Sequence, residues 1–325
     1  MKTKNLILLV VALCYATATR AQNEVIGAIL QTGDNVTMYY GVNALKDAYG
    51  AAAETGSVIT LTAGTFNNPG TIKKSVSIYG VGFENNQVTT INGILYIQSS
   101  SAETMLDGVR IEGVMLSSTI YVKWVKNLVV SNSRCNYNFT VNGDNVQNVT
   151  VKQCYIIGNI TGTAKVDGLL FQNCYITGQN TYDNAEGRIQ IDHCILTGDV
   201  THYRALYTNN IINSSKRVAE GSTAQNNIFL NIASLDTSVL SDGNWFRPTL
   251  STLFTDGTDL TYSVDRTYTL SSPETYVGTD ETPVGINGAG HTWKNRASTP
   301  VINSLTLGVS GSTINVTYDA ETRNP

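Results

Sequence analysis

The chain has 325 residues, a formal net charge of −4, 42% hydrophobic residues and only 14% charged residues. This hydrophobic share is ample for an extended core and argues against a disordered chain. The acidic balance, with no cluster of lysine and arginine, excludes an electrostatic reason to hold nucleic acid or an anionic membrane surface.

The first 21 residues have the pattern of a secretory signal peptide. Two lysines precede the apolar run Leu6–Leu13, which is too short to span a bilayer, and a small-residue cleavage pattern ends at Ala21. The alternative is a lipoprotein anchor on Cys14, although a bulky leucine precedes that cysteine. We expect the mature protein to begin at Gln22, with 18 basic and 25 acidic residues and a net charge of −7. It would be secreted or held at the outer cell surface, with no transmembrane segment.

A helix is predicted over residues 41–54 (GVNALKDAYGAAAE). Alanine is abundant there, Leu45, Ala48 and Ala52 fall near helical spacing, and Gly56 ends the element. A helix at this place would cover the open end of the repeating strands that follow it.

A six-residue phrase with strand-like alternation recurs through most of the chain. Its copies are ITLTAG (59–64), VSIYGV (76–81), TTINGI (89–94), VRIEGV (109–114), LVVSNS (128–133), VTVKQC (149–154), LLFQNC (169–174), IQIDHC (189–194), LYTNNI (206–211) and TAQNNI (223–228). From VRIEGV on, the ends of successive copies lie 19, 21, 20, 20, 17 and 17 positions apart. A period near twenty predicts an all-β, single-stranded parallel β-helix of about ten rungs, whose units bury a core only by stacking.

Each position of the phrase predicts one column of the solenoid. The first and third positions are apolar and are expected to point inward. The fifth holds Asn132, Gln153, Asn173, His193, Asn210 and Asn227, which we expect to form a hydrogen-bonded corner ladder.

Cysteines dominate the sixth position. Of Cys135, Cys154, Cys174 and Cys194, the last three share it, which favours a buried thiol stack over two disulfides because side chains that point in parallel do not suit the disulfide dihedral. Metal ligation is less favoured still, since neither a CxxC motif nor a nearby histidine pair accompanies them.

The succession of segments resembles a known family. The helix, then SVITLTAGTF (57–66), IKKSVSIYGVGF (72–83) and the repeated strands, is similar to right-handed parallel β-helix proteins of the pectate-lyase-like superfamily. The resemblance covers about residues 42–290, and DGNWF (242–246) and VGINGAG (284–290) resemble the ends of its secreted bacterial members. It implies a right-handed coil.

The period is lost after the last copy of the phrase. Residues 234–296 are expected to wrap the last coil as a cap, and residues 300–318 read as a β-hairpin around a Ser310-Gly311 turn. The expected division is a β-helix over residues 22–298 and a hairpin tail over residues 299–325. The tail resembles those of exported proteins of Bacteroidetes-like bacteria.

The densest charged patch supplies candidate catalytic residues. Polysaccharide lyases on this fold remove a proton next to a uronate carboxylate with a basic residue, usually beside carboxylate-bound Ca²⁺. The candidates for that chemistry are Arg188, Asp192, His202 and Arg204. The alternative is that these charges simply solvate the rung faces. Ca²⁺ is expected only if the protein is a lyase; otherwise neither a cofactor nor a metal site is predicted.

Tyrosines supply candidate binding residues. Tyr155 and Tyr175 follow the inward sixth position and are therefore expected to point outward on successive rungs, while Tyr182 and Tyr203 lie in neighbouring turns. Outward aromatic rings suit the apolar faces of sugars, although tyrosine also packs well on sheet surfaces for purely structural reasons. We therefore predict an exported monomer that binds a polysaccharide or cell-surface glycan in an adhesin-like role. The alternatives are a polysaccharide lyase that cleaves acidic glycans by β-elimination, and a structural surface spacer.

Overall fold

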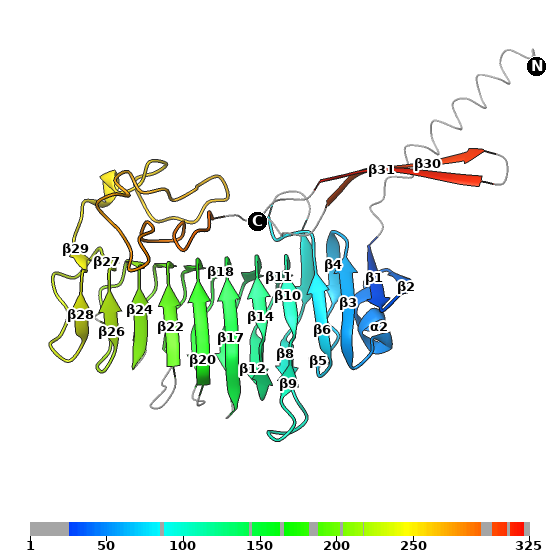
Figure 1. Cartoon of the computed structure of the whole chain (residues 1–325), viewed down its shortest axis with the longest axis horizontal. Coiled ribbons are helices and arrows are strands. Elements are labelled where there is room, and N and C mark those ends of the chain that lie inside the picture. The colour runs from blue at the N-terminus through cyan, green and yellow to red at the C-terminus, as the bar shows by residue number, and fades with distance from the viewer. Residues whose placement is uncertain are drawn as a thin grey trace, which may run out of the picture.

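The computed structural model describes residues 26–84, 88–142, 145–162, 166–181, 188–201, 204–216, 218–293, 301–310 and 313–321, with backbone only for Arg188 and the last two ranges. The chain is nearly all β and winds into a parallel β-solenoid of about nine turns (Figure 1). The predicted all-β solenoid is thereby confirmed.

Three sheets run along the solenoid axis within the described residues. Sheet A contains β1 (Gly27–Thr32), β2 (Asn35–Tyr40), β3 (Thr55–Leu61), β6 (Ser75–Tyr79), β9 (Leu106–Asp107), β10 (Arg110–Glu112), β13 (Val125–Lys126), β14 (Val129–Ser131), β17 (Val146–Lys152), β20 (Val166–Gln172), β22 (Arg188–Asp192), β24 (Ala205–Thr208), β26 (Thr223–Gln225) and β28 (Leu240–Asp242). Sheet B contains β4 (Gly64–Asn67), β7 (Thr89–Asn92), β11 (Met115–Leu116), β15 (Arg134–Cys135), β18 (Tyr155–Ile156), β21 (Tyr175–Ile176), β23 (Ile195–Leu196), β25 (Ile211–Ile212), β27 (Ile228–Phe229) and β29 (Trp245–Phe246). Sheet C contains β5 (Thr71–Ile72), β8 (Leu95–Gln98), β12 (Ile120–Lys123), β16 (Phe139–Val141) and β19 (Ile160–Gly162).

The two ends of the chain depart from the parallel pattern. Helix α2 (Ala44–Ala51) lies inside the predicted helical range and buries Ala44, Leu45 and Ala48 against the first coil. Strand β1 pairs antiparallel with both β2 and β3, so the solenoid begins with a sheet edge that the repeat does not predict. At the other end, β30 (Val301–Ser310) and β31 (Thr313–Glu321) pair as the predicted antiparallel hairpin.

The inward columns follow the predicted alternation with one correction. Val149, Leu169 and Ile189 pair in register and are buried, as expected. Ile189 then pairs with Ala205, and Leu206 pairs with Gln190 on the outward face. The last two copies of the phrase are therefore shifted by one residue, because the shorter turns bring the strand in one position earlier.

This shift rearranges the interior polar column. Asn210 and Asn227 occupy the interior column of Cys194 and not the corner column of His193. Asn244 continues the same interior column. The Nδ2 atoms of Asn210 and Asn227 donate to the next amide oxygen at 2.9 and 3.0 Å, and the backbone N–H of Cys194 donates to Asn210 at 2.8 Å. The interior column therefore changes from thiols to a hydrogen-bonded amide ladder.

The predicted thiol stack is confirmed for Cys154, Cys174 and Cys194, which are free, buried and neighbours along one interior column. Cys135 is also free and buried, but it pairs with Ile156 in sheet B. Burial raises the pKa of the Cys135, Cys154 and Cys174 thiols well above the usual value. Thiol chemistry needs the thiolate, which is scarce here. We expect the folded chain without residues 1–21 to show no reaction with an aromatic disulfide reagent, and four reactive thiols after unfolding in guanidinium. Any fast-reacting thiol in the folded protein would contradict this packing.

A C-terminal segment without regular strands lies over sheet B. This strap, residues 250–293, begins with a short 3₁₀ helix (Leu250–Thr252) and follows the solenoid back toward its middle (Figure 1). Its Leu253, Phe254 and Ile286 join a second apolar cluster with Ile195 and Ile211 of the rungs. Among the described residues, none of the helices has the length and apolar character needed to cross a bilayer.

Candidate functional site

Of the four residues predicted as a catalytic group, the two with described side chains, Asp192 and Arg204, do not come together. Asp192 ends β22 and pairs with Thr208, whereas Arg204 lies four residues before Thr208, at the start of β24. A separation of four strand residues corresponds to about 13 Å. His202 and the side chain of Arg188 lie outside the described residues.

Asp192 serves the scaffold. Its carboxylate is 7% exposed and accepts hydrogen bonds from Thr208 at 2.8 Å, Asn209 at 3.0 Å and Gln172 at 3.1 Å. Burial alone would raise the pKa of Asp192, but His193, with Nδ1 3.1 Å away, and these donors outweigh it and hold the pKa below its usual range. The carboxylate is therefore covered and both of its oxygens accept hydrogen bonds from neighbouring side chains, so in this structure it holds adjacent rungs together.

The corner after sheet A fixes the strap. Residues at this corner have left-handed backbone conformations, a region in which asparagine is enriched. They are Asn132, Gln153, Asn173, His193, Asn209 and Asn226, with φ between 45° and 61°. The side chain of Asn173 donates to the carbonyls of Ile286 and Gly288, both at 3.0 Å, instead of bonding from rung to rung.

His193 belongs to the same attachment. Its Nε2 lies 3.1 Å from Oγ1 of Thr282 and 3.5 Å from Oδ1 of Asp280, and the ring has no exposed surface. Further along, Gln153 donates to Thr292 and Asn226 donates to Val277. Of the expected ladder, Gln153, Asn173 and His193 are therefore anchors for the strap, whereas Asn210 and Asn227 bond from rung to rung as predicted.

The strap also covers two of the predicted glycan-binding tyrosines, Tyr155 and Tyr175. Tyr175 points away from the solenoid interior, as its position in β21 predicts, but its ring is fully buried between Tyr155, Tyr262 and Tyr268. Tyr155 is half-buried, with the ring of Tyr262 stacked on it at 3.7 Å between centroids. Contrary to the expected exposed position, Tyr175 is therefore covered by the strap in this structure, and Tyr182 and Tyr203 lie outside the described residues.

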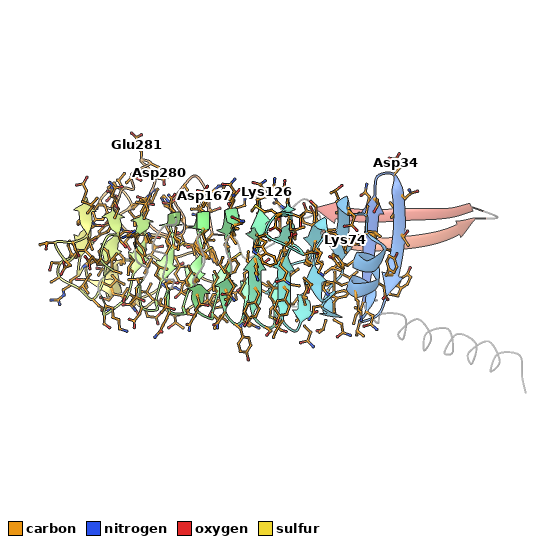
Figure 2. All side chains as sticks on the ribbon, turned by 90° about the horizontal axis from the view of Figure 1, so that it is seen from below. Asp34, Lys74, Lys126, Asp167, Asp280 and Glu281 are labelled. Atoms are coloured by element: carbon orange, nitrogen blue, oxygen red, sulfur yellow. The ribbon has the colours of Figure 1, made fainter. Side chains whose placement is uncertain are left out.

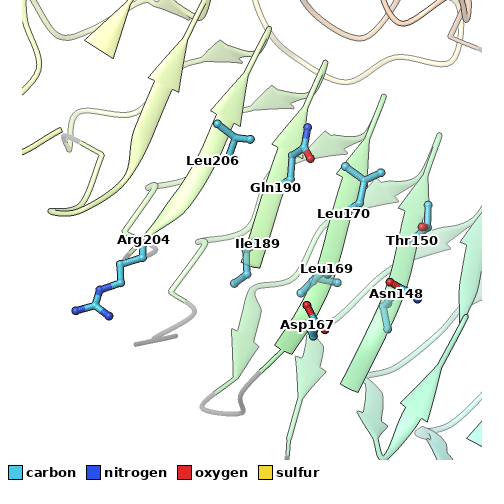
Figure 3. A pocket seen from close by; sticks show the side chains of 11 residues that line it. Asn148, Thr150, Asp167, Leu169, Leu170, Ile189, Gln190, Arg204 and Leu206 are labelled. Atoms are coloured by element: carbon cyan, nitrogen blue, oxygen red, sulfur yellow. The ribbon is translucent and has the colours of Figure 1, made fainter. Parts of the chain in front are cut away.

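A cavity of about 510 Å³ lies on the outward face of sheet A, away from the strap (Figure 3). Its floor is a row of side chains from four successive strands, which pair in register. They are Thr150, Leu170, Gln190 and Leu206. The floor therefore alternates hydrogen-bonding groups with apolar side chains at the spacing of the strands, about 4.8 Å.

Polar residues border this cavity at the N-terminal ends of the strands. Asn148, Asp167 and Arg204 line it, and Arg204 is the one predicted catalytic residue whose described side chain does so. The backbone is left-handed at Asn148 (φ 50°), Gly168 (φ 89°) and Arg204 (φ 53°), which bends β17 and β20 near their N-terminal ends and turns the chain into β24. The cavity thus combines a floor of alternating apolar and hydrogen-bonding side chains with an anionic, a cationic and an amide group at its border.

A second cavity of about 550 Å³ opens on the same corner nearer the N-terminus, lined by Lys73, Ser99 and Asp107 among others. Asn127 connects the two cavities. Its Nδ2 donates to Asp107 at 2.7 Å, and Nδ2 of Asn148 donates to Asn127 at 3.3 Å. The hydrogen-bonded row therefore begins in one cavity and ends in the other.

Charged side chains accompany this corner along the solenoid. Lys126 and Asp167 follow one another along the long axis in Figure 2. Nζ of Lys126 lies 3.1 Å from Asp107. We call the surface from the second cavity through Asn127 to the first cavity the corner track.

Neither the charged patch nor the aromatic residues of the sequence indicate the corner track. A signal for it exists, because the residue immediately before the phrase is Gly108, Asn127, Asn148 and Gly168 in four consecutive copies. Glycine and asparagine at a fixed place in a repeat indicate a turn with left-handed backbone. Such a column marks an aligned corner, where polar side chains of neighbouring rungs meet.

Within the described ranges, no group of three histidine, cysteine, aspartate or glutamate side chains is placed to hold a metal ion. No protein-family model, curated protein or solved structure matches this chain. The corner track is therefore interpreted from its own chemistry.

Proposed function

We propose that this is an exported β-helix protein of the pectate-lyase-like type, and that it binds a linear polysaccharide along the corner track without cleaving it. The observation that supports this function most is the pair of cavities on one corner, joined by the hydrogen-bonded row Asp107, Asn127 and Asn148. Sugars present apolar ring faces and a rim of hydroxyls, which match an apolar floor bordered by amides and charges.

The dimensions of the track favour a polymer over a single sugar. Ser75 of β6 lines the second cavity and Arg204 beside β24 lines the first, six strand spacings away in sheet A. Six spacings correspond to about 29 Å. Successive rungs offer polar groups to successive sugar units of an extended polysaccharide. Affinity is therefore expected to rise with oligosaccharide length until the track is filled.

A panel of immobilised neutral and acidic linear polysaccharides tests binding. On the polysaccharide that binds best, Leu170→Gln combined with Arg204→Ala is expected to weaken the dissociation constant at least about tenfold, because it removes apolar floor and the cation of the rim. Leu170→Gln keeps the outward face compatible with its neighbour Gln190 in the same row.

The matched control is Tyr121→Thr on sheet C. Tyr121 stacks on the partly exposed Tyr96 at 5.1 Å and pairs with Thr140, so the substitution removes an outward aromatic pair elsewhere on the solenoid. Binding is expected to remain unchanged in this variant. If Tyr121→Thr abolishes binding and the sheet A variant does not, the glycan site lies on sheet C and the corner track is the wrong surface.

A lyase is the second candidate, because Arg204 borders the cavity and arginine is a base that lyases use. This function predicts new ultraviolet absorbance from unsaturated uronates on incubation with acidic glycans, with or without Ca²⁺, and its loss in Arg204→Ala. Binding without any such absorbance supports the non-catalytic function. Neither binding nor absorbance across the panel leaves a structural spacer.

A further inference from the structure

The N-terminal end of the solenoid presents an apolar face to solvent. Val36, Met38 and Tyr40 of β2 are 62%, 54% and 63% exposed, and Ile29 of β1 lies opposite Met38 in register. Strand β2 is also the edge of sheet A among the described residues. We call these four residues the N-terminal apolar face. A sheet edge beside a cluster of exposed apolar side chains is a surface that proteins usually cover.

The C-terminal hairpin also has an apolar face that needs a surface to pack on. Its register places Leu305 opposite Tyr318, Leu307 opposite Val316 and Val309 opposite Ile314, all at alternate positions. The positions between them pair Thr306 with Thr317 and Gly308 with Asn315. Strand alternation therefore gives the hairpin one apolar face and one polar face. An isolated two-stranded hairpin is only marginally stable in water, so its apolar face requires a surface to pack on.

The connection between strap and hairpin is long enough to join these two faces. The strap runs toward the N-terminal end, and its Thr292 is held by Gln153, directly after β17. Sheet A places β1 five strand spacings beyond β17, which corresponds to about 24 Å. The eight residue steps from Trp293 to Val301 span at most about 26–29 Å. Figure 1 shows β30 and β31 at the same end of the molecule as β1 and β2.

We propose that the hairpin β30–β31 packs its apolar face on the N-terminal apolar face of the same chain and so covers the first coil with the last segment. The two layers would pack as a small sandwich, with apolar side chains of both faces interdigitating between sheets about 10 Å apart. The strap and hairpin together then connect both ends of the solenoid. This proposal is independent of the glycan-binding function, because it uses neither the corner track nor any residue of it.

Cysteine pairs in the full mature chain test the contact. Met38→Cys with Val316→Cys is expected to form an intramolecular disulfide under mild oxidation, seen as a faster-migrating monomer on a non-reducing gel at any protein concentration. The control pair, Met38→Cys with Thr317→Cys, places the second thiol on the polar face of the hairpin and is expected to cross-link at least about tenfold more slowly. The four native thiols are buried and serve as an internal background.

Three outcomes overturn the proposal. Equal cross-linking of the two pairs would mean a mobile hairpin, and concentration-dependent dimers alone would mean that a second copy covers the face. No cross-link in either pair would mean that something other than the hairpin covers the N-terminal apolar face.

A second measurement does not depend on disulfide geometry. Met38→Asp is expected to accelerate amide hydrogen exchange in β30 and β31 at least about tenfold, whereas Asn35→Asp, on the other face of β2, leaves the exchange rate unchanged. Unaltered exchange in Met38→Asp would contradict the contact.

Discussion

Gly178→Ala is expected to destabilise the solenoid by at least about 3 kcal/mol, because there is no space for a methyl group between consecutive turns. Gly158, Gly178 and Gly198 stack at the turn that follows sheet B. A Cβ atom on Gly178 would lie 1.9 Å from the carbonyl oxygen of Gly158 and 2.2 Å from its carbonyl carbon. Both atoms belong to the backbone of the preceding rung, so the two coils have to separate.

The measurement is the midpoint of denaturant or thermal unfolding, and the expected fall in melting temperature is about 6–12 °C. Gly50→Ala is the matched control. Gly50 lies in α2 with no atom within 4 Å of its would-be Cβ, so alanine is expected to leave stability unchanged or raise it by up to about 1 kcal/mol. A Gly178→Ala protein as stable as the parent would mean that the turns are not stacked this closely.

Asp192→Ala is expected to cost about 3–5 kcal/mol at neutral pH, because it leaves the donors of Gln172, Thr208 and Asn209 buried without their acceptor and His193 without its neighbouring carboxylate. The control is Asp34→Ala, which also removes one carboxylate. Asp34 is exposed and belongs to no buried hydrogen-bond network, so this substitution is expected to change stability by less than about 0.5 kcal/mol.

The effect of Asp192 depends on pH in a defined direction. Its pKa is lower in the folded protein than in the unfolded chain, so the carboxylate stabilises the fold fully above about pH 4. This contribution is lost as the pH falls through the depressed folded-state pKa. The stability difference between parent and Asp192→Ala, followed by denaturant titration from pH 7 to pH 3, is therefore expected to shrink at acid pH. A difference that grows on acidification would contradict the direction of this pKa shift.

The sequence predicts the solenoid well because its information is local and repeated. The same buried strand position is occupied by Val149, Leu169 and Ile189 in three copies of the phrase, so one ambiguous residue does not change the predicted alignment of the strands. The phrase fails at Leu206, where a spacing of 17 residues allows two alignments that look equally apolar and only strand pairing decides between them.

The strap is the part that could not be predicted. Its attachment uses backbone carbonyls of residues such as Ile286 and Gly288, which leave no mark in the amino-acid sequence. Tyr175 illustrates this limit. Strand alternation correctly predicts that its side chain points away from the solenoid interior, but the strap, about 85 residues later in the sequence, decides whether the ring is exposed. The glycine and asparagine column before the phrase marks the corner in the sequence, but the two cavities of the corner track depend on how side chains of neighbouring rungs meet, which the sequence does not give.

The anchoring of the strap also has a consequence for the way the solenoid opens. Stacked repeats contact only their neighbours, so such proteins are free to lose structure one rung at a time. Here, residues 277–292 bridge Asn226, Asn209, His193, Asn173 and Gln153, which belong to five consecutive rungs. Those rungs cannot separate without releasing the same segment, so we expect amide exchange to report them as one cooperative block with a single opening free energy. Before β17, residues 277–292 make no such contact within the described residues, and the strap reaches back through Tyr262, whose hydroxyl donates to Glu84. These earlier rungs are therefore expected to open in smaller steps. Because the strap is synthesised after every rung it joins, this block becomes cooperative only when the chain is nearly complete.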